Sequence, residues 1–343
     1  MRVSRESLVQ IAKENAQARA FNNHDIVAAY LTGSLVSANV EPLLGGTADI
    51  DIVFVHATSP AVIREIVKLT PDFHLDIAHR AKAEFKSPRE LRTDPWLGFE
   101  MYNPTLLFER EKFFDFVQAG LRAGFEFGAP ALTLQRCRKL LAESRKDWLD
   151  VMDIKEEQVG PKEVCQYLRA VQNAANTISI LSGPPLQDRR LLLDFPARAQ
   201  AADRPNFTAE LLSLVGVNQF DADILSKWLP EWKQAFWAAS DNPRVDLRVH
   251  AARANYYEKA MQAMTQGDMP VAALWPMLLT WTLSAEVLVN GGQKEWQMTC
   301  THLGLLGKAF EGKTQALDKF IDKIEVYLDE LALANGVETS ANL

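Results

Sequence analysis

The chain has 343 residues, of which 48% are hydrophobic and 24% charged, and its net charge is −7. These values are typical of a soluble globular protein, and the length allows two domains that each bury a core. The acidic balance and the absence of a large Lys/Arg cluster argue against long nucleic acid as a partner, because a polyphosphate chain calls for a basic surface.

The first part of the chain alternates helical and strand patterns. The expected elements, in chain order, are a helix over 5–22, strands over 26–32 and 49–55, a helix from Ser59-Pro60 to about residue 70, a strand over 73–85, a short helix that opens at Ser87-Pro88, and a strand over 105–110. This order predicts a small α/β domain with a mixed sheet over residues 1–125.

The pattern becomes helical from residue 130 onward. Residues 164–181 place their apolar side chains on one stripe, and residues 302–333 are also amphipathic. We therefore expect an all-helical bundle over residues 130–343. The whole chain is predicted to be α+β, with a small mixed-sheet domain followed by that bundle.

One later segment, residues 270–289, has roughly the length and apolarity of a membrane span. It contains Pro276 and Glu286, and its Trp275 and Trp281 lie inside the segment and not at its edges. We expect it to form a buried helix of the bundle. The N-terminal segment is too polar for a secretory signal, so a cytoplasmic protein with no membrane contact is expected.

Two aspartates interrupt the apolar strand that follows the Gly-Ser turn. Side chains alternate along a strand, so Asp49 and Asp51 point to the same face. If this strand and the strand over 73–85 are neighbours, Asp76 joins them in a cluster of three carboxylates. Such a cluster is self-repulsive when empty but suits a hard divalent cation such as Mg²⁺, and two such ions can assist an in-line phosphoryl displacement.

The Gly33-Ser34 turn supplies the complementary half of a phosphate site. A strand that ends in glycine allows close approach of a ligand to the backbone, and a helix that starts after Ser34 would present free N–H groups to an anion. A phosphate chain could be held between these donors and the metal ions.

Together, the Gly33-Ser34 turn, the Asp49-x-Asp51 pair and Asp76 resemble the signature of the DNA polymerase beta-type nucleotidyltransferase superfamily. The resemblance implies transfer of a nucleotide from an NTP to an acceptor, with release of pyrophosphate. It implies that Asp49 and Asp51 ligate two Mg²⁺ ions and that Asp76 is the third ligand and helps to deprotonate the acceptor hydroxyl. Gly33 and Ser34 would bind the β- and γ-phosphates.

The resemblance covers about residues 8–115. A small catalytic domain followed by a helical one is also similar to the aminoglycoside nucleotidyltransferase branch. That comparison implies that residues 130–343 bind the acceptor. We expect the active site in the cleft between the two domains, since ligand sites favour domain interfaces. The expected donor is ATP, and the expected acceptor is a hydroxyl of a small molecule or protein.

The loop after Ser34, residues 35–38, lacks the arginine that is often found there in the superfamily. The first candidate for the missing nucleotide-binding cation is Arg80, which shares a strand face with Asp76. Others come from the start of the helical domain: Arg136, Arg138, Lys139, Arg145 and Lys146.

Two further interpretations remain open. In one, Asp49 caps a turn and Asp51 pairs with a basic neighbour, which leaves Asp76 unexplained. In the other, the domain keeps the fold but acts as a catalytically degenerate, nucleotide-binding sensor or scaffold. An acidic group in the helical part would suit a cationic acceptor but is ordinarily a solvated face; its members are Asp147, Asp150, Asp153, Glu156 and Glu157.

Overall fold

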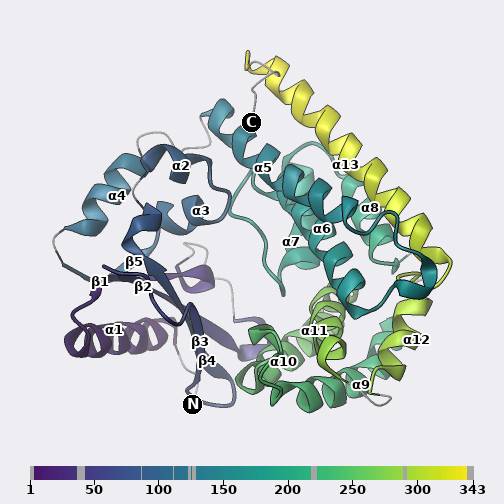
Figure 1. Cartoon of the computed structure of the whole chain (residues 1–343), viewed down its shortest axis with the longest axis horizontal. Helices are drawn as coiled ribbons and strands as arrows, with labels where there is room; N and C mark the ends of the chain where they lie inside the picture. The colour runs from purple at the N-terminus through teal and green to yellow at the C-terminus, as the bar shows by residue number, and fades with distance from the viewer. Residues whose placement is uncertain are drawn as a thin grey trace. The chain divides into compact units, whose positions relative to one another are not determined.

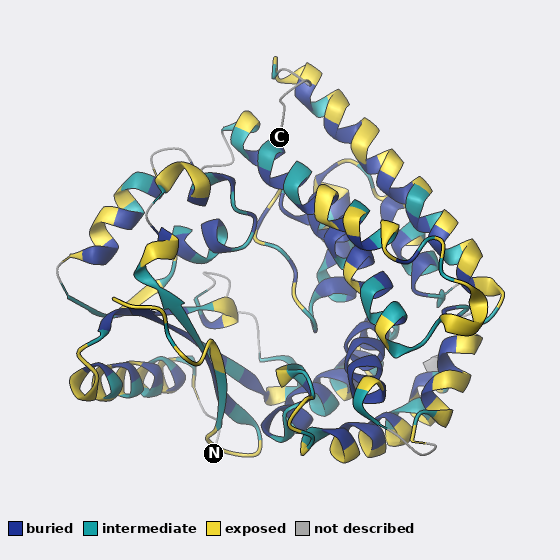
Figure 2. Cartoon of the chain, viewed as in Figure 1, coloured by how far each residue is buried: buried dark blue, intermediate teal, exposed yellow. Residues whose placement is uncertain are grey.

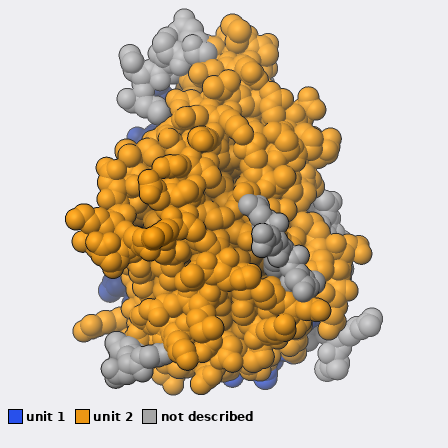
Figure 3. Space-filling model, turned by 90° about the vertical axis from the view of Figure 1, so that its right-hand side faces the viewer, with its two compact units in different colours: residues 1–129 blue, residues 130–343 orange. Residues whose placement is uncertain are grey.

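The computed structural model describes residues 4–36, 43–85, 87–110, 112–122, 125, 129–217, 222–288 and 292–337. The chain divides into two compact units, residues 1–129 and residues 130–343. Figure 3 colours these units separately. The first unit carries the strands and the second is helical, so the chain is α+β as predicted (Figure 1).

The first unit is built on a five-stranded mixed sheet with the order β3-β4-β2-β1-β5. Strands β2 and β4 run parallel, and the other neighbours run antiparallel. Its elements are α1 (Arg5–Asn22), β1 (Ile26–Thr32), β2 (Ala48–His56), β3 (Arg64–Lys68), β4 (Phe73–Ala81), α2 (Pro88–Thr93), α3 (Leu97–Tyr102), β5 (Thr105–Glu109) and α4 (Phe113–Arg122).

Helix α1 covers one face of the sheet. It begins at Ser4, whose side chain accepts a hydrogen bond from the Ser7 backbone N–H. Its buried positions recur every four residues and are mostly alanine, which lets the helix lie close to the strands. They are Leu8, Ala12, Ala16 and Ala20, and they pack with Leu31, Ile50, Ile52, Phe54 and Ile77 of the sheet.

The short helices α2, α3 and α4 cover part of the opposite face. Tyr30, Val53 and Val55 lie in this second core, together with Phe114 and Leu121 of α4. Because side chains alternate along β2, Asp49 and Asp51 point to the same face as Val53. The two aspartates are half-buried, whereas Val53 and Val55 are buried. The aspartates therefore lie at the edge of the apolar core that α2, α3 and α4 form on this face.

The helix predicted from Ser59-Pro60 to residue 70 is wrong. Residues 64–68 form strand β3, which pairs antiparallel with β4 at the edge of the sheet. The backbone groups on the free edge of β4 take partners from this segment, and the β-branched Ile66 and Val67 fit a strand. Tertiary pairing has overridden the local helical signal.

The other strand predictions agree more closely. The strand expected over 73–85 ends at Ala81, and Lys82–Phe85 form a 3₁₀ turn. Helix α2 begins as expected, with Pro88 in its first turn and the Ser87 hydroxyl accepting from the Glu90 backbone N–H. Helices α3 and α4 were not anticipated.

The second unit contains helices throughout its described residues. They are α5 (Pro130–Leu149), α6 (Pro161–Ser179), α7 (Leu191–Ala201), α8 (Asn206–Leu214), α9 (Ala222–Ser240), α10 (Ala254–Thr265), α11 (Leu274–Val287), α12 (Lys294–His302) and α13 (Ala309–Ala334). Helix α11 is buried along nearly its whole length, as expected for the apolar segment 270–289, of which residue 289 lies outside the described residues (Figure 2). Among the described residues, no helix combines the length and apolarity needed to cross a membrane.

Candidate active site

Three carboxylates meet on one face of the sheet. Strands β2 and β4 are parallel neighbours, and Asp51 is the register partner of Asp76. Asp49, Asp51 and Asp76 each offer an oxygen, and these oxygens lie within 4.8 Å of one another. The condition under which the three aspartates were expected to gather, adjacency of the two strands, is therefore met. We call these residues the triad.

The chemistry of the triad fits a hard divalent cation. All three donors are carboxylate oxygens, the ligand type that Mg²⁺ and Ca²⁺ prefer, and their spacing suits oxygens that share an ion. Asp49 and Asp51 are half-buried and Asp76 is buried. Three carboxylates so close together repel one another unless positive charge is supplied nearby.

The Gly33-Ser34 turn adjoins the triad directly. Strand β1 ends at Thr32, the register partner of Asp51, so the chain turns away beside that carboxylate. Gly33 has a φ of +74°, and a Cβ there would lie 2.8 Å from Asp51 Cγ and overlap its carboxylate. Gly33 and Ser34 are both exposed to solvent. The turn and the triad thus form one continuous polar site.

The helix expected after Ser34 is replaced by a single 3₁₀ turn, Gly33–Leu35. The Arg5 side chain of α1 donates to the Leu35 carbonyl oxygen at 2.8 Å and fixes the end of this turn. Of the loop over 35–38, residues 37 and 38 lie outside the described residues. The anion-binding role expected for a helix start at Ser34 therefore falls to the turn itself and stays a prediction.

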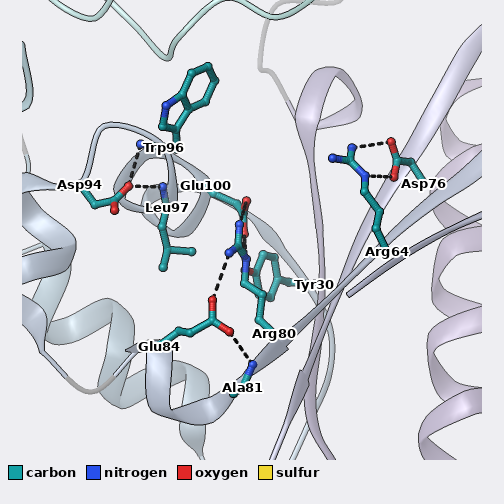
Figure 4. A network of polar contacts seen from close by, with 10 residues as sticks. All are labelled: Tyr30, Arg64, Asp76, Arg80, Ala81, Glu84, Asp94, Trp96, Leu97 and Glu100. Atoms are coloured by element: carbon teal, nitrogen blue, oxygen red, sulfur yellow. Dashed lines mark hydrogen bonds and ion pairs between the residues drawn. The ribbon is translucent and has the colours of Figure 1, made fainter. Parts of the chain in front are cut away.

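Arg64 on the edge strand β3 was missed by the sequence analysis. Its guanidinium grips Asp76 in a two-pronged contact, with Nε donating to Oδ1 at 2.7 Å and Nη2 donating to Oδ2 at 2.6 Å (Figure 4). The segment was expected to be helical, which would have placed this side chain elsewhere. The available signal was the pair Ile66-Val67, typical of a strand.

Arg80 lies further along β4 and is held by carboxylates. It donates to Glu100 from Nε and Nη2 at 3.2 Å each and to Glu84 from Nη1 at 3.2 Å. The Tyr30 hydroxyl donates to Glu100 at 2.5 Å. Figure 4 shows this group beside α3 and apart from the Arg64–Asp76 ion pair.

These contacts set the ionisation of the group. Burial, with the Glu100 carboxylate adding to it, raises the pKa of Tyr30 well above its usual value. Burial alone would lower the pKa of Arg80, but Glu100 reverses this and raises it. Arg80 is thus a permanently charged member of a half-buried cluster, and its nucleotide-binding role stays a prediction.

The other candidate cations belong to the second unit. Arg138 pairs with Asp329, and Arg145 pairs with Asp318 and Asp322, all on α13. Arg136 is fully buried. These side chains contribute to the interior and surface of the helical unit.

The acidic group of the second unit is only in part a solvated face. Asp147 is buried and accepts two hydrogen bonds from Arg169, at 2.8 and 2.7 Å. Asp150 accepts from Gln166 at 2.6 Å. Asp147 therefore serves the packing of α5 against α6.

A network of polar side chains lies on the face of the sheet that α1 covers. His79 Nε2 contacts Glu65 at 3.0 Å, and its Nδ1 contacts His56 Nε2 at 2.8 Å. His56 Nδ1 contacts Asp25 at 3.1 Å, and Arg19 of α1 pairs with Glu65. This network connects α1, β2, β3 and β4, and it stabilises the edge strand β3 on the face opposite Arg64.

No protein-family model matches the sequence, and no curated protein matches it. Among solved structures, one similar chain is a nucleotidyltransferase-like protein from Exiguobacterium sibiricum. The two chains share 8% sequence identity, with 98% of this chain and 96% of that chain covered, at a TM-score of 0.31. At that score the likeness carries no functional argument, so function has to be argued from the site.

Proposed function

We propose that this chain is a metal-dependent nucleotidyltransferase that transfers AMP from ATP to a hydroxyl of a small molecule or protein. The observation that carries the proposal is the convergence of Asp49, Asp51 and Asp76 beside the Gly33-Ser34 turn. The sequence resemblance to the polymerase beta-type superfamily assigns the same residues to that chemistry.

The donor set supports metal binding at the triad. Asp49 and Asp51 would hold Mg²⁺, with Asp76 as the third carboxylate ligand. When bound, the ions would neutralise the charge that develops on the phosphate oxygens during an in-line displacement. Catalysis would then depend on positioning and charge neutralisation, without a covalent enzyme intermediate.

The remaining steps are assigned to the chain's own residues. Gly33 and Ser34 would hold the β- and γ-phosphates through the exposed turn. The acceptor oxygen forms a bond to the α-phosphorus, the bond from that phosphorus to the bridging oxygen breaks, and pyrophosphate leaves. The proton of the acceptor hydroxyl passes to a carboxylate, for which Asp76 is the candidate.

The helical unit is the proposed acceptor-binding part. It is the larger of the two units. The identity of its acceptor would be set by contacts outside the triad.

The test is a transfer assay with ATP labelled at the α-phosphorus, Mg²⁺ and a cell extract. Label on a metabolite or a protein, together with pyrophosphate release, supports the proposal, and Asp51→Asn should abolish both. Asp115→Asn, which removes an exposed carboxylate at the start of α4, is the matched control and should keep the activity.

Two other outcomes would contradict the proposal. Label on RNA or an oligonucleotide would point to a polynucleotide acceptor. ATP binding by calorimetry, with no transfer to any acceptor in a broad panel, would favour the sensor or scaffold interpretation.

A further inference from the structure

Arg64 places a positive charge on the carboxylate that completes the triad. Its guanidinium engages both oxygens of Asp76, at 2.7 and 2.6 Å. The Asp76 side chain is 2% exposed, while the Arg64 side chain is 48% exposed. A buried carboxylate beside two others needs such a partner, and the two-pronged geometry is the strongest form an arginine offers.

The position of Arg64 in the sheet explains how it reaches Asp76. On β3, Ile66 is the register partner of Asp76, and Arg64 lies two residues away on the same strand. Residues two apart on a strand share a face, so Arg64 and the triad lie on one side of the sheet. Because β3 is the short edge strand, the outer part of this side chain extends to solvent.

Arg64 and a divalent ion would compete for the oxygens of Asp76. The ion would take oxygens of Asp49, Asp51 and Asp76, which lie within 4.8 Å of one another. A guanidinium already bound to both Asp76 oxygens would then face a doubly charged ion at short range, which is repulsive.

We propose that Arg64 is a resident counter-ion of the triad, which holds Asp76 while no metal is bound and is displaced from it when a divalent cation enters. Arg64 thus sets the metal affinity of the site, because it competes with the metal for the oxygens of Asp76. This inference rests on the metal-binding part of the proposed function. It adds a cation that competes with the metal for Asp76, which the superfamily resemblance does not imply.

A purely structural role for Arg64 predicts the opposite result on mutation. If the Arg64–Asp76 ion pair only shaped the site, its removal would disorder Asp76 and weaken metal binding. If it competes with the metal, its removal strengthens binding. The sign of the change in affinity therefore separates the two roles.

The experiment is a Mn²⁺ titration of the full chain at pH 7.5 without nucleotide, with free Mn²⁺ measured by electron paramagnetic resonance. Arg64→Gln should bind Mn²⁺ roughly tenfold more tightly than the wild type, the order expected when one unit charge is removed a few ångströms from a divalent ion in water-like surroundings. Lys13→Gln is the matched control, because it removes the same charge from an exposed position of α1, on the opposite face of the sheet. Its affinity should stay within about twofold of the wild type.

A second variant protects the test against misfolding of Arg64→Gln. Arg64→Lys keeps the charge but loses the two-pronged contact, so its Mn²⁺ affinity should lie between those of the wild type and Arg64→Gln. Folding of each variant is checked by circular dichroism.

The outcomes separate this inference from the proposed function. Unchanged or weaker Mn²⁺ binding in folded Arg64→Gln and Arg64→Lys, with binding still lost in Asp51→Asn, overturns the counter-ion role and leaves the metal site standing. If the wild type shows no Mn²⁺ binding that depends on Asp51, the metal site fails, and the counter-ion role fails with it.

Discussion

Gly33 and Asp51 lie so close together that no side chain fits between them. A Cβ on Gly33 would stand 2.8 Å from Asp51 Cγ and overlap the carboxylate, and the φ of +74° is itself unfavourable for other residues. The glycine is therefore required twice, once for the turn and once for the placement of a triad carboxylate. A contact of this kind couples the shape of the turn to the position of Asp51.

The first prediction is that Gly33→Ala abolishes Mn²⁺ binding, because the new methyl group must push Asp51 or the turn out of place. Gly46→Ala is the control. Gly46 has a similar φ of +70° but nothing within 4 Å of its Cβ position, so that variant feels backbone strain alone. It should lose about 1 kcal/mol of stability and keep its metal affinity. Equal loss of Mn²⁺ binding in both variants would show that strain, and not the contact with Asp51, is responsible.

Much of this arrangement could be read from the sequence. The apolar run around Asp49 and Asp51 identified β2, and the alternation of β4 placed Asp76 on a defined face. Their adjacency was only a condition at that stage, because the order of strands in a sheet is set by tertiary packing. The register of Asp51 against Asp76 met that condition.

The part that could not be read is the edge strand. The Ser59-Pro60 pair is a good helix start, and the segment after it has no long apolar alternation. Strand β3 exists because β4 offers it a row of backbone partners, and a local pattern does not contain that information. Missing β3 meant missing Arg64, whose importance depends wholly on lying next to Asp76.

The second prediction concerns the stability of the metal-free protein. Asp51→Asn removes one of three mutually repelling carboxylates, so it should raise the free energy of unfolding by about 1 kcal/mol without metal. Urea unfolding in the presence of a chelator measures this. Asp115→Asn removes the same charge at the start of α4, where a carboxylate is favourable, and should not raise stability. A loss of stability in Asp51→Asn would mean that the favourable contacts of this carboxylate outweigh the repulsion.

The third prediction concerns the ion pair between Arg80 and Glu100. Both side chains are less than one-third exposed, so the removal of either leaves the other charge poorly compensated. Arg80→Gln and Glu100→Gln should each cost about 2 kcal/mol, and the double variant should cost clearly less than the sum. Urea unfolding of the four proteins gives the coupling. Strict additivity would show that the pair contributes nothing.

The same variants address nucleotide binding by Arg80. If Arg80 contacts a phosphate, Arg80→Gln weakens ATP affinity while Glu100→Gln does not, because the cation is still present. Equal ATP affinities in all four proteins would assign Arg80 to the structural cluster alone.

The last prediction is that the first unit loses stability in mild acid through His79. Burial lowers the pKa of His79 below its usual value of about 6.5, so the folded chain resists a proton that the unfolded chain accepts. Stability is therefore intact above about pH 7 and falls as the pH drops through 6.5. Glu65 and Asp25 add to the loss at lower pH. Burial would raise the pKa of each, but their hydrogen bonds lower it: those from Arg19 and His79 to Glu65, and those from Thr58 and His56 to Asp25.

Thermal unfolding between pH 8 and 5 measures this dependence. His79→Gln should flatten the fall between about pH 7 and pH 5.5, since the group that titrates is gone. His24→Gln, at an exposed histidine of the same unit, should leave the fall unchanged. We expect the fall to originate where β4 meets β3, because His79 of β4 contacts Glu65 on that edge strand. Hydrogen exchange at Arg64–Lys68 should therefore accelerate at pH 5.5 in the wild type. An exchange rate there that rises no faster than that of β1 would place the acid-sensitive step elsewhere.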